Sequence, residues 1–252
     1  MTVWEGLFLG LLQGLTEFLP ISSSGHLVLA EKILALPSDL FFNVLMHVGT
    51  LFAVLTVFFK PIKKMMRHPI RDKKMLLITL SSIPTFIIAF AVKTWVPEKY
   101  FNGLLPLGFF ITAVLLISTS FSKNNRPLYQ RPLVPTLVAG IAQGIAVFPG
   151  ISRSGATIAS LSFFNIKRTQ SADFSFLMSI PVIIGGAALE GYEAIQSSIV
   201  INWLPLIVGI IAAYISGIIA IKFLITLLKH TDLRWFSLYM IIPLLLSLIV
   251  SW

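Results

Sequence analysis

The chain has 252 residues, of which 56% are hydrophobic and only 12% charged, and its formal net charge at pH 7 is +9. A soluble domain carries ~25% charged residues, and a single core could not bury this much apolar surface. The composition excludes a soluble globular enzyme, a disordered chain and a nucleic-acid-binding domain, and the lack of cysteine excludes disulfides, thiol catalysis and thiolate metal sites.

Long unbroken apolar runs predict an all-α integral membrane protein. An outer-membrane barrel, the alternative membrane class, would need strands of roughly ten residues that alternate apolar and polar side chains. The runs of this chain do not alternate in that way, so helices are favoured.

The first element, Val3–Leu36, is apolar but broken at Leu19–His26, where Pro, Ser and Gly end one helix and cap the next. Each half is too short to cross a bilayer alone, so we expect a re-entrant helical hairpin with its tip at membrane depth. Such backbone must be buried in protein or face water. Further along the chain, Leu133–Phe164 is broken in the same way at Phe148–Gly155 and predicts a second hairpin.

Six further runs approach the ~20 apolar residues that a transmembrane helix needs. The loop between the first two carries seven basic residues between Lys60 and Lys74, so it should be cytoplasmic. Most other basic residues also fall inside, provided that both hairpins return to the side they entered. The six expected spans are Leu40–Phe59, Met75–Val92, Gly103–Ser122, Phe174–Leu189, one from within Ala194–Ile221 to about Leu228, and Trp235–Trp252.

The two interrupted stretches are copies of one pattern, offset by 130 residues. We therefore expect one membrane domain, 1–252, built of repeats at about 1–125 and 126–252, each with a hairpin and three spans. Three is odd, so the repeats have inverted topology, and their hairpin tips meet near the midplane. Half-helix N-termini there suit an anion such as phosphate. The identical pairs are Gly10/Gly140, Gln13/Gln143, Gly14/Gly144, Phe18/Phe148, Ile21/Ile151, Ser22/Ser152, Ser24/Ser154 and Gly25/Gly155.

The first tip holds the only ionisable groups between Gly6 and Ala30, namely Glu17 and His26. Ser22 and Ser23 precede His26 by four and three residues, so either hydroxyl can share a helix face with the imidazole. A hydroxyl beside an imidazole is a nucleophile–base arrangement. Glu17 can orient the ring, accept a proton or hold a cation. The plainer interpretations are that Ser22 is an N-cap and His26 a hydrogen-bonded structural residue.

The second tip supplies a cation and hydroxyls. Arg153 lies within a turn of a helix start and suits two-pronged contact with phosphate. A structural ion pair between Glu17 and Arg153 is the alternative. His47, eight residues into a span, is either a core histidine or a neighbour of the site. The remaining polar candidates at this tip are Ser152, Ser154 and Thr157.

Two segments carry a family resemblance. Gln13–His26 resembles the first signature of the undecaprenyl-diphosphate phosphatases, also called bacitracin-resistance proteins, and Pro149–Thr157 resembles the second. His47–Thr50 and Phe174–Leu177 resemble further family segments, so the similarity covers essentially the whole chain. The resemblance implies removal of the terminal phosphate of undecaprenyl diphosphate, which yields the lipid carrier for cell-wall glycans and confers bacitracin resistance. It also implies a site that opens to the extracytoplasmic side of the bacterial plasma membrane.

The resemblance implies residue roles as well. Ser23 matches the nucleophile, His26 its proton-transfer partner and Glu17 the second acidic residue of the first signature. Many members have Glu where this chain has Gln13, which is a weaker ligand for Mg²⁺ or Ca²⁺, so for such a cation Glu17 must suffice or Glu5 must help. The diphosphate-binding segment matches Arg153 with Ser152, Ser154 and Thr157, and Ser22, Gln13 and His47 are further candidates for substrate contact.

Several alternatives stay open. His26 as the nucleophile, or a water activated by Glu17, can replace Ser23. A lipid-phosphate transporter or flippase is the rival class, because inverted repeats with broken helices are typical of transporters. The Ser23–His26 pair beside Glu17 favours chemistry, since binding alone needs no general base. The expected partners are the polyprenyl diphosphate and membrane lipids, with a second copy of the chain as an open alternative.

Overall fold

The computed structural model describes residues 1–36, 40–97, 101–196 and 202–250. In these ranges the regular structure is helical, apart from an isolated bridge between Arg126 and Ile166. The elements in chain order are α1 (Val3–Phe18), α2 (Ser23–Ile33), α3 (Leu40–Val57), α4 (Phe59–Arg67), α5 (Lys73–Trp95), the 3-10 helix η2 (Asn102–Leu104), α6 (Leu105–Ser118), the 3-10 helix η3 (Thr119–Phe121), α7 (Leu133–Ile145), α8 (Arg153–Phe163), α9 (Arg168–Gln196), α10 (Trp203–Leu227), α11 (Arg234–Tyr239) and α12 (Ile241–Ile249).

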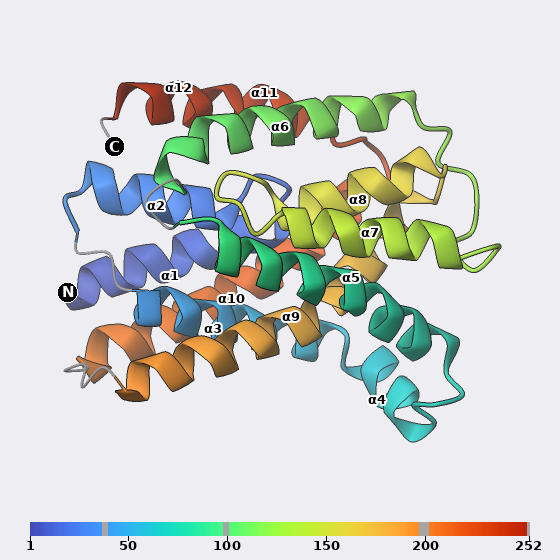
Figure 1. The fold of residues 1–252 in the computed structure, drawn as a ribbon, viewed down its shortest axis with the longest axis horizontal. Helices are drawn as coiled ribbons and strands as arrows, with labels where there is room; N and C mark the ends of the chain where they lie inside the picture. The colour runs from blue at the N-terminus through green and yellow to red at the C-terminus, as the bar shows by residue number, and fades with distance from the viewer. Residues whose placement is uncertain (37–39, 98–100, 197–201, 251–252) are drawn as a thin grey trace.

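The two interrupted stretches form helical hairpins, α1–α2 and α7–α8, that break where the sequence predicts. Helix α1 ends before Pro20, because the residue that precedes a proline is pushed out of the helical region; Leu19 is extended at φ −67° and ψ 145°. Helix α8 begins after Ser152, whose hydroxyl accepts the backbone N–H of Gly155 at 3.0 Å. Figure 1 shows the hairpins entering from opposite ends of the molecule, with their breaks facing each other near its middle.

Three helices in the described residues are long and apolar enough to cross a membrane: α5, Arg168–Leu189 within α9, and α10. They correspond to three of the six expected spans, although residues 197–201, in the stretch before α10, lie outside the described residues. A fourth arises if α3 and α4, which meet at 78°, are counted together. Three to four candidate spans is therefore the number that length and composition support.

The other expected spans are helical but differ in detail. Leu40–Phe59 does not run straight to its end, because α3 stops at Val57 and the basic, amphipathic α4 turns away with Met65 buried. Gly103–Ser122 gives the 14-residue α6 between two 3-10 turns. Trp235–Trp252 is split at Met240, because Pro243 has no N–H to bond the carbonyl four residues earlier; residues 251–252 lie outside the described part.

Packing between the two halves is reciprocal. Helix α1 packs along α10 as α7 packs along α5, and α2 touches α12 as α8 touches α6. A pair of repeat-related glycines allows the closest approaches. A Cβ on Gly10 would lie 2.2 Å from the carbonyl oxygen of Gly209, and one on Gly140 would lie 2.1 Å from that of Ser81. Both hairpins thus dock on a span of the opposite repeat through a backbone that has no room for a side chain.

The outer face of the helices is apolar, as a lipid-facing surface requires. On α10 the side chains of Ile207, Ile211, Ile215 and Ile219 are 49 to 57% exposed, whereas Gly209 and other small residues on the inner face are packed. The core lies where α1, α3 and α9 meet, and there the rings of Phe18 and Phe176 pack edge to face at 5.4 Å. Exposed apolar stripes around a packed centre are consistent with an integral membrane protein.

Candidate active site

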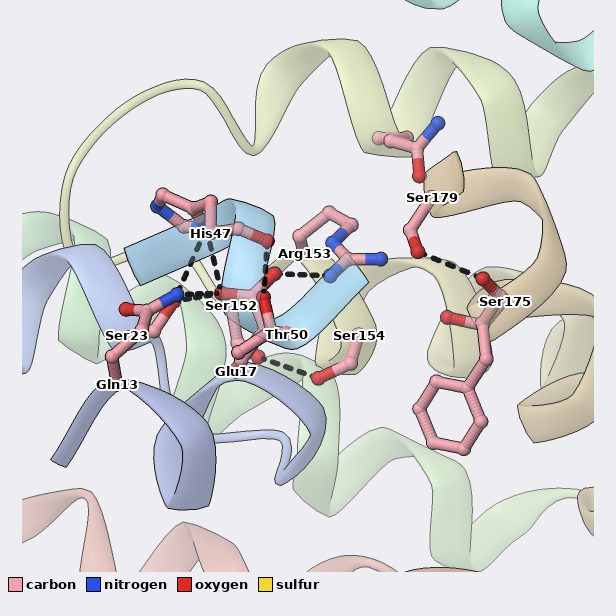
Figure 2. A network of polar contacts seen from close by, with 12 residues as sticks. Gln13, Glu17, Ser23, His47, Thr50, Ser152, Arg153, Ser154, Ser175 and Ser179 are labelled. Carbon is pink, nitrogen blue, oxygen red and sulfur yellow. Dashed lines mark hydrogen bonds and ion pairs between the residues drawn. The ribbon is translucent and has the colours of Figure 1, made fainter. Parts of the chain in front are cut away.

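The buried carboxylate of Glu17 is the centre of the polar network between the two hairpin tips. Its Oε1 accepts a hydrogen bond from the guanidinium of Arg153, with which it forms an ion pair. Its Oε2 accepts the hydroxyl of Ser23 at 2.5 Å. Figure 2 shows the side chains that converge on this carboxylate: Gln13, Ser23, His47 and Arg153.

Local structure explains why these groups meet. Gln13 and Glu17 are four residues apart on the last turns of α1, so they share a face. Ser23 is the first residue of α2, and the break folds it back over Glu17. Arg153 is the first residue of α8 and reaches across from the other hairpin. A nucleophile candidate and a cation therefore share one carboxylate although they are 130 residues apart.

His47 joins the network from α3, where its ring contacts polar groups of the first tip. The side-chain nitrogen of Gln13 lies 2.9 Å from Oε2 of Glu17 and 2.8 Å from Nδ1 of His47. Because that amide nitrogen can only donate, Nδ1 is the acceptor and the ring hydrogen resides on Nε2. Nδ1 also lies 3.3 Å from the Glu17 carboxylate. Gln13 thus holds both groups in place.

A cavity of about 240 Å³ opens beside the network. A second nitrogen of Arg153, Nη1, is buried and has no hydrogen-bond partner among the described residues, so it is a spare donor at the site. The polar lining of the cavity comes from both tips and from α3: Glu17, Ser23, Ser24, His47, Ser152 and Arg153. Its apolar lining is Val44, Ala146, Val147, Ile151, Val182, Ile183, Gly186 and Ala187.

Four of the expected substrate contacts, Gln13 among them, do not line the cavity and instead hold other groups in place. Ser22 caps α2 by accepting the N–H of Gly25 at 3.3 Å. Ser154 donates to the carbonyl of Leu19 at 3.0 Å and so ties the second tip to the first. Thr157 is buried against α9, with its hydroxyl 2.6 Å from that of Ser175.

The expected pair of Ser23 and His26 does not form. Nδ1 of His26 lies 2.7 Å from the backbone carbonyl of Ser22, and Nε2 lies 2.8 Å from the hydroxyl of Tyr239. The ring lines a separate apolar groove together with residues such as Leu29. Three residues advance a helix by about 300°, so the side chains of Ser23 and His26 point about 60° apart around α2. Because of this offset, Ser23 lines the cavity beside Glu17 and His26 lines the apolar groove.

Sequence reasoning missed three residues: Ser24, which lines the cavity, and Thr112 and Tyr239, whose partners are distant in the chain. Ser24, two residues before His26, points away from that ring and therefore lines the cavity. The hydroxyl of Thr112 donates to the carbonyl of Gly150 and accepts the N–H of Ser152, each at 2.9 Å, and so fixes the second tip. Tyr239 lies 213 residues from His26. The position of Ser24 could have been read from helical spacing; those of Thr112 and Tyr239 could not.

The site offers few ligands for a metal. Among the described residues, no group of three His, Cys, Asp or Glu side chains is placed to hold an ion. Glu17 is a single carboxylate, and the side-chain oxygen of Gln13 is buried without a partner in the described part of the chain. Mg²⁺ is commonly held by one or two carboxylates and the oxygens of a phosphate substrate. These residues therefore fit a divalent cation only when substrate oxygens complete its shell.

Comparison with known proteins places the chain among relatives of similar length. The model of a family described as "Bacitracin resistance protein BacA" matches residues 6–245. An undecaprenyl-diphosphatase of Carboxydothermus hydrogenoformans is 38% identical over 245 residues, covering 95% of this chain and 94% of the relative. One from Treponema denticola is 38% identical (96% and 94% covered), and one from Korarchaeum cryptofilum is 39% identical (96% and 97% covered).

Proposed function

Because the chain belongs to the bacitracin resistance protein BacA family and is an undecaprenyl-diphosphatase, we propose that the cavity beside Glu17 is its active site. The observation that carries the proposal is the convergence of a hydroxyl, a carboxylate and a guanidinium on one cavity. Removal of a terminal phosphate needs a nucleophile, a proton acceptor and positive charge, and these three groups supply them.

The diphosphate would bind at the second tip. Arg153 offers its free Nη1 donor, and the first turn of α8 directs backbone N–H groups and the positive end of the helix dipole toward the break. Ser152 and Ser24 add hydroxyls to the wall. The apolar wall formed by Val182 and Ile183 of α9 suits the first isoprene units of the lipid.

Ser23 would attack the terminal phosphorus, and Glu17 would take its proton, since the hydroxyl already donates to that carboxylate at 2.5 Å. The bond to the bridging oxygen breaks, and undecaprenyl phosphate leaves with the electron pair. Water then hydrolyses the phosphoserine, which releases inorganic phosphate and restores the Ser23 hydroxyl, and the proton held by Glu17 passes to the products. In a second route the same carboxylate activates water directly. His26 lies outside the cavity in both routes.

A divalent cation, Mg²⁺ or Ca²⁺, is part of the proposal only in combination with substrate. Glu17 would hold it beside the diphosphate oxygens, and Gln13, whose amide nitrogen faces Glu17, would have to turn its oxygen toward that carboxylate to join it. Such a cation would neutralise charge on the leaving phosphate. Chelation followed by titration with each metal tests this requirement.

The same proposal places six spans and two re-entrant hairpins as an inverted repeat in the plasma membrane, with the cavity open to the outside. The reciprocal packing of the hairpins and the basic α4 support this orientation. Because the chain has no cysteine, single cysteines report topology cleanly. An impermeant thiol reagent applied to intact cells should label Asn202→Cys and spare His68→Cys; labelling at position 68 would reverse the orientation.

Purified protein in detergent tests the activity of the site, because a transporter has no two sides to connect there. We expect release of phosphate from undecaprenyl diphosphate, its loss in Ser23→Ala and Glu17→Gln, and wild-type rates in the control Ser120→Ala, whose hydroxyl donates to the carbonyl of Ile117. Rates in Ser23→Ala and Glu17→Gln equal to wild type would place the chemistry elsewhere.

The reciprocal packing of broken helices also suits a lipid-phosphate flippase, which would bind the diphosphate without releasing phosphate.

A further inference from the structure

The first tip holds a serine in a backbone conformation that the corresponding serine of the second tip does not adopt. Ser22 has φ +71° and ψ 94°, in the region that residues with a side chain rarely adopt. Its counterpart Ser152 has a relaxed φ of −73°. Such a conformation persists only when its surroundings impose it, and strained residues cluster at functional sites. The residue directly after Ser22 is Ser23, whose hydroxyl contacts Glu17.

The ring of His26 adds a second hydrogen bond to the Ser22 carbonyl, which also accepts the backbone N–H of His26 at 3.1 Å. Its Nδ1 lies 2.7 Å from the Ser22 carbonyl, and because a carbonyl only accepts, Nδ1 carries the hydrogen. In the neutral ring, Nε2 then accepts the hydroxyl hydrogen of Tyr239 at 2.8 Å. The counterpart of His26 in the second tip is Ala156, which can make no such bond. The strained serine and the imidazole therefore occur together, in one tip only.

Tyr239 fixes the ring from a distant part of the chain. It is the last residue of α11, and its ring stacks on His26 with a centroid separation of 5.7 Å and an angle of 9°. Phe109 of α6 closes the other side edge-on, also at 5.7 Å. His26 is buried, so its orientation is set by these two rings and by the hydrogen bonds at its two nitrogens.

We propose that Tyr239 is a positioning residue: through His26 it holds the Ser22 carbonyl and so orients the Ser23 hydroxyl on Glu17. The inference rests on the proposed function, since it assigns Ser23 as the attacking group. On this assignment His26, which lies outside the cavity, acts on the reaction without touching substrate. Tyr239 reaches Ser23 only through His26 and Ser22, so its effect on turnover should depend entirely on the imidazole.

The test compares Tyr239→Phe with Tyr214→Phe, a matched control whose lost hydroxyl lies 3.2 Å from that of Thr56 on an exposed surface. Tyr239→Phe keeps the stacked ring but removes the donor to Nε2. We expect its kcat to fall about tenfold, the effect of one buried hydrogen bond, with KM unchanged. Tyr214→Phe should keep wild-type kcat, and both variants should melt at similar temperatures in detergent.

A double-mutant cycle supplies the readout that a merely structural role would not give. In a His26→Ala background, Tyr239→Phe should cause no further loss of kcat, because the path to Ser22 is already cut. Full additivity of the two changes, an unchanged kcat in Tyr239→Phe, a rise in KM alone, or a melting temperature well below that of Tyr214→Phe would each overturn the inference. Ser23→Ala and Glu17→Gln are assayed alongside: activity in Ser23→Ala alone removes the premise of this inference, and wild-type activity in both variants overturns the proposed function, whatever Tyr239 does.

Discussion

The two hairpin tips share a backbone plan but not a chemistry. In each, a serine caps the second helix by accepting the N–H of a glycine three residues on, Gly25 in the first tip and Gly155 in the second. Each first helix also docks on a span of the opposite repeat through a glycine. The repeat therefore supplies the same scaffold twice: a half-helix N-terminus presented at a break.

Differences appear at the side chains that follow the caps. Ser23, the proposed nucleophile, corresponds to Arg153, the proposed anion contact, and Glu17 corresponds to Val147. A phosphoryl transfer needs one nucleophile with its proton acceptor and one cation on the far side of the phosphate. Two identical tips would supply the same group twice. Divergence of the tips, with Glu17 and Arg153 paired across them, provides both functions in one cavity.

The strongest test of this difference between the tips is to remove the proposed nucleophile, Ser23, from the first tip. Ser23→Ala should lower kcat by ~10³ if covalent catalysis is lost. Ser24→Ala, which deletes a neighbouring hydroxyl of the same cavity, should lower kcat by less than tenfold. Phosphate release and binding of undecaprenyl diphosphate are measured together, since Ser23→Ala should still bind. Equal losses in Ser23→Ala and Ser24→Ala would mean that neither is the nucleophile.

The second-largest effect is expected from a change to Arg153, the cation of the second tip. Arg153→Lys keeps the charge but loses the two-pronged contact, so we expect kcat/KM to fall by about 10². Arg168→Lys is the control, because Arg168 lies away from the cavity with its guanidinium 3.9 Å from Asp232. Steady-state kinetics measure kcat/KM for both variants. A near-normal kcat/KM in Arg153→Lys would make this arginine only a structural partner of Glu17.

The two tips also differ in backbone conformation, and changes to it should affect the free energy of unfolding. The second tip has its positive φ at Gly150, +85°, where a Cβ would lie 2.5 Å from the carbonyl oxygen of Leu105. Gly150→Ala should lower stability by about 3 kcal/mol, through strain and collision. Ser22→Gly relieves strain and loses a cap, so its change should be within about 1 kcal/mol. Thermal melting in detergent compares them; a harmless Gly150→Ala would contradict the packing.

The smallest expected effect concerns the glutamines before each tip. Gln13→Glu adds a carboxylate next to Glu17 and should change kcat only about threefold while lowering the Mg²⁺ concentration needed for half-maximal activity. Gln143, its counterpart, lies near Thr85 and the Met178 carbonyl. Gln143→Glu should lower the melting temperature without altering the metal dependence. A shared metal response in both variants would remove Gln13 from the proposed cation site.

Local features of the fold could be predicted because their causes act within a turn of the chain. Pro20 ends α1, and Ser22 and Ser152 cap α2 and α8, through contacts with residues at most three positions away. Apolar runs likewise placed α5, α9 and α10 correctly. The split at Met240 was foreseeable from Pro243, whose missing N–H acts on the preceding turn. The meeting of Glu17 and Ser23 with Arg153 could be predicted as well, because an inverted repeat brings the two hairpin tips together.

Tertiary structure alone decided which partners the polar side chains took. The Ser23 hydroxyl has His26 within reach along α2, by helical spacing, and Glu17 within reach across the break. The choice depends on Tyr239, 213 residues from His26, which supplies a donor and a stacking ring on the side away from the cavity. A buried imidazole must satisfy both nitrogens, so it turns to where partners lie. That location is a property of packed helices, which no local pattern encodes.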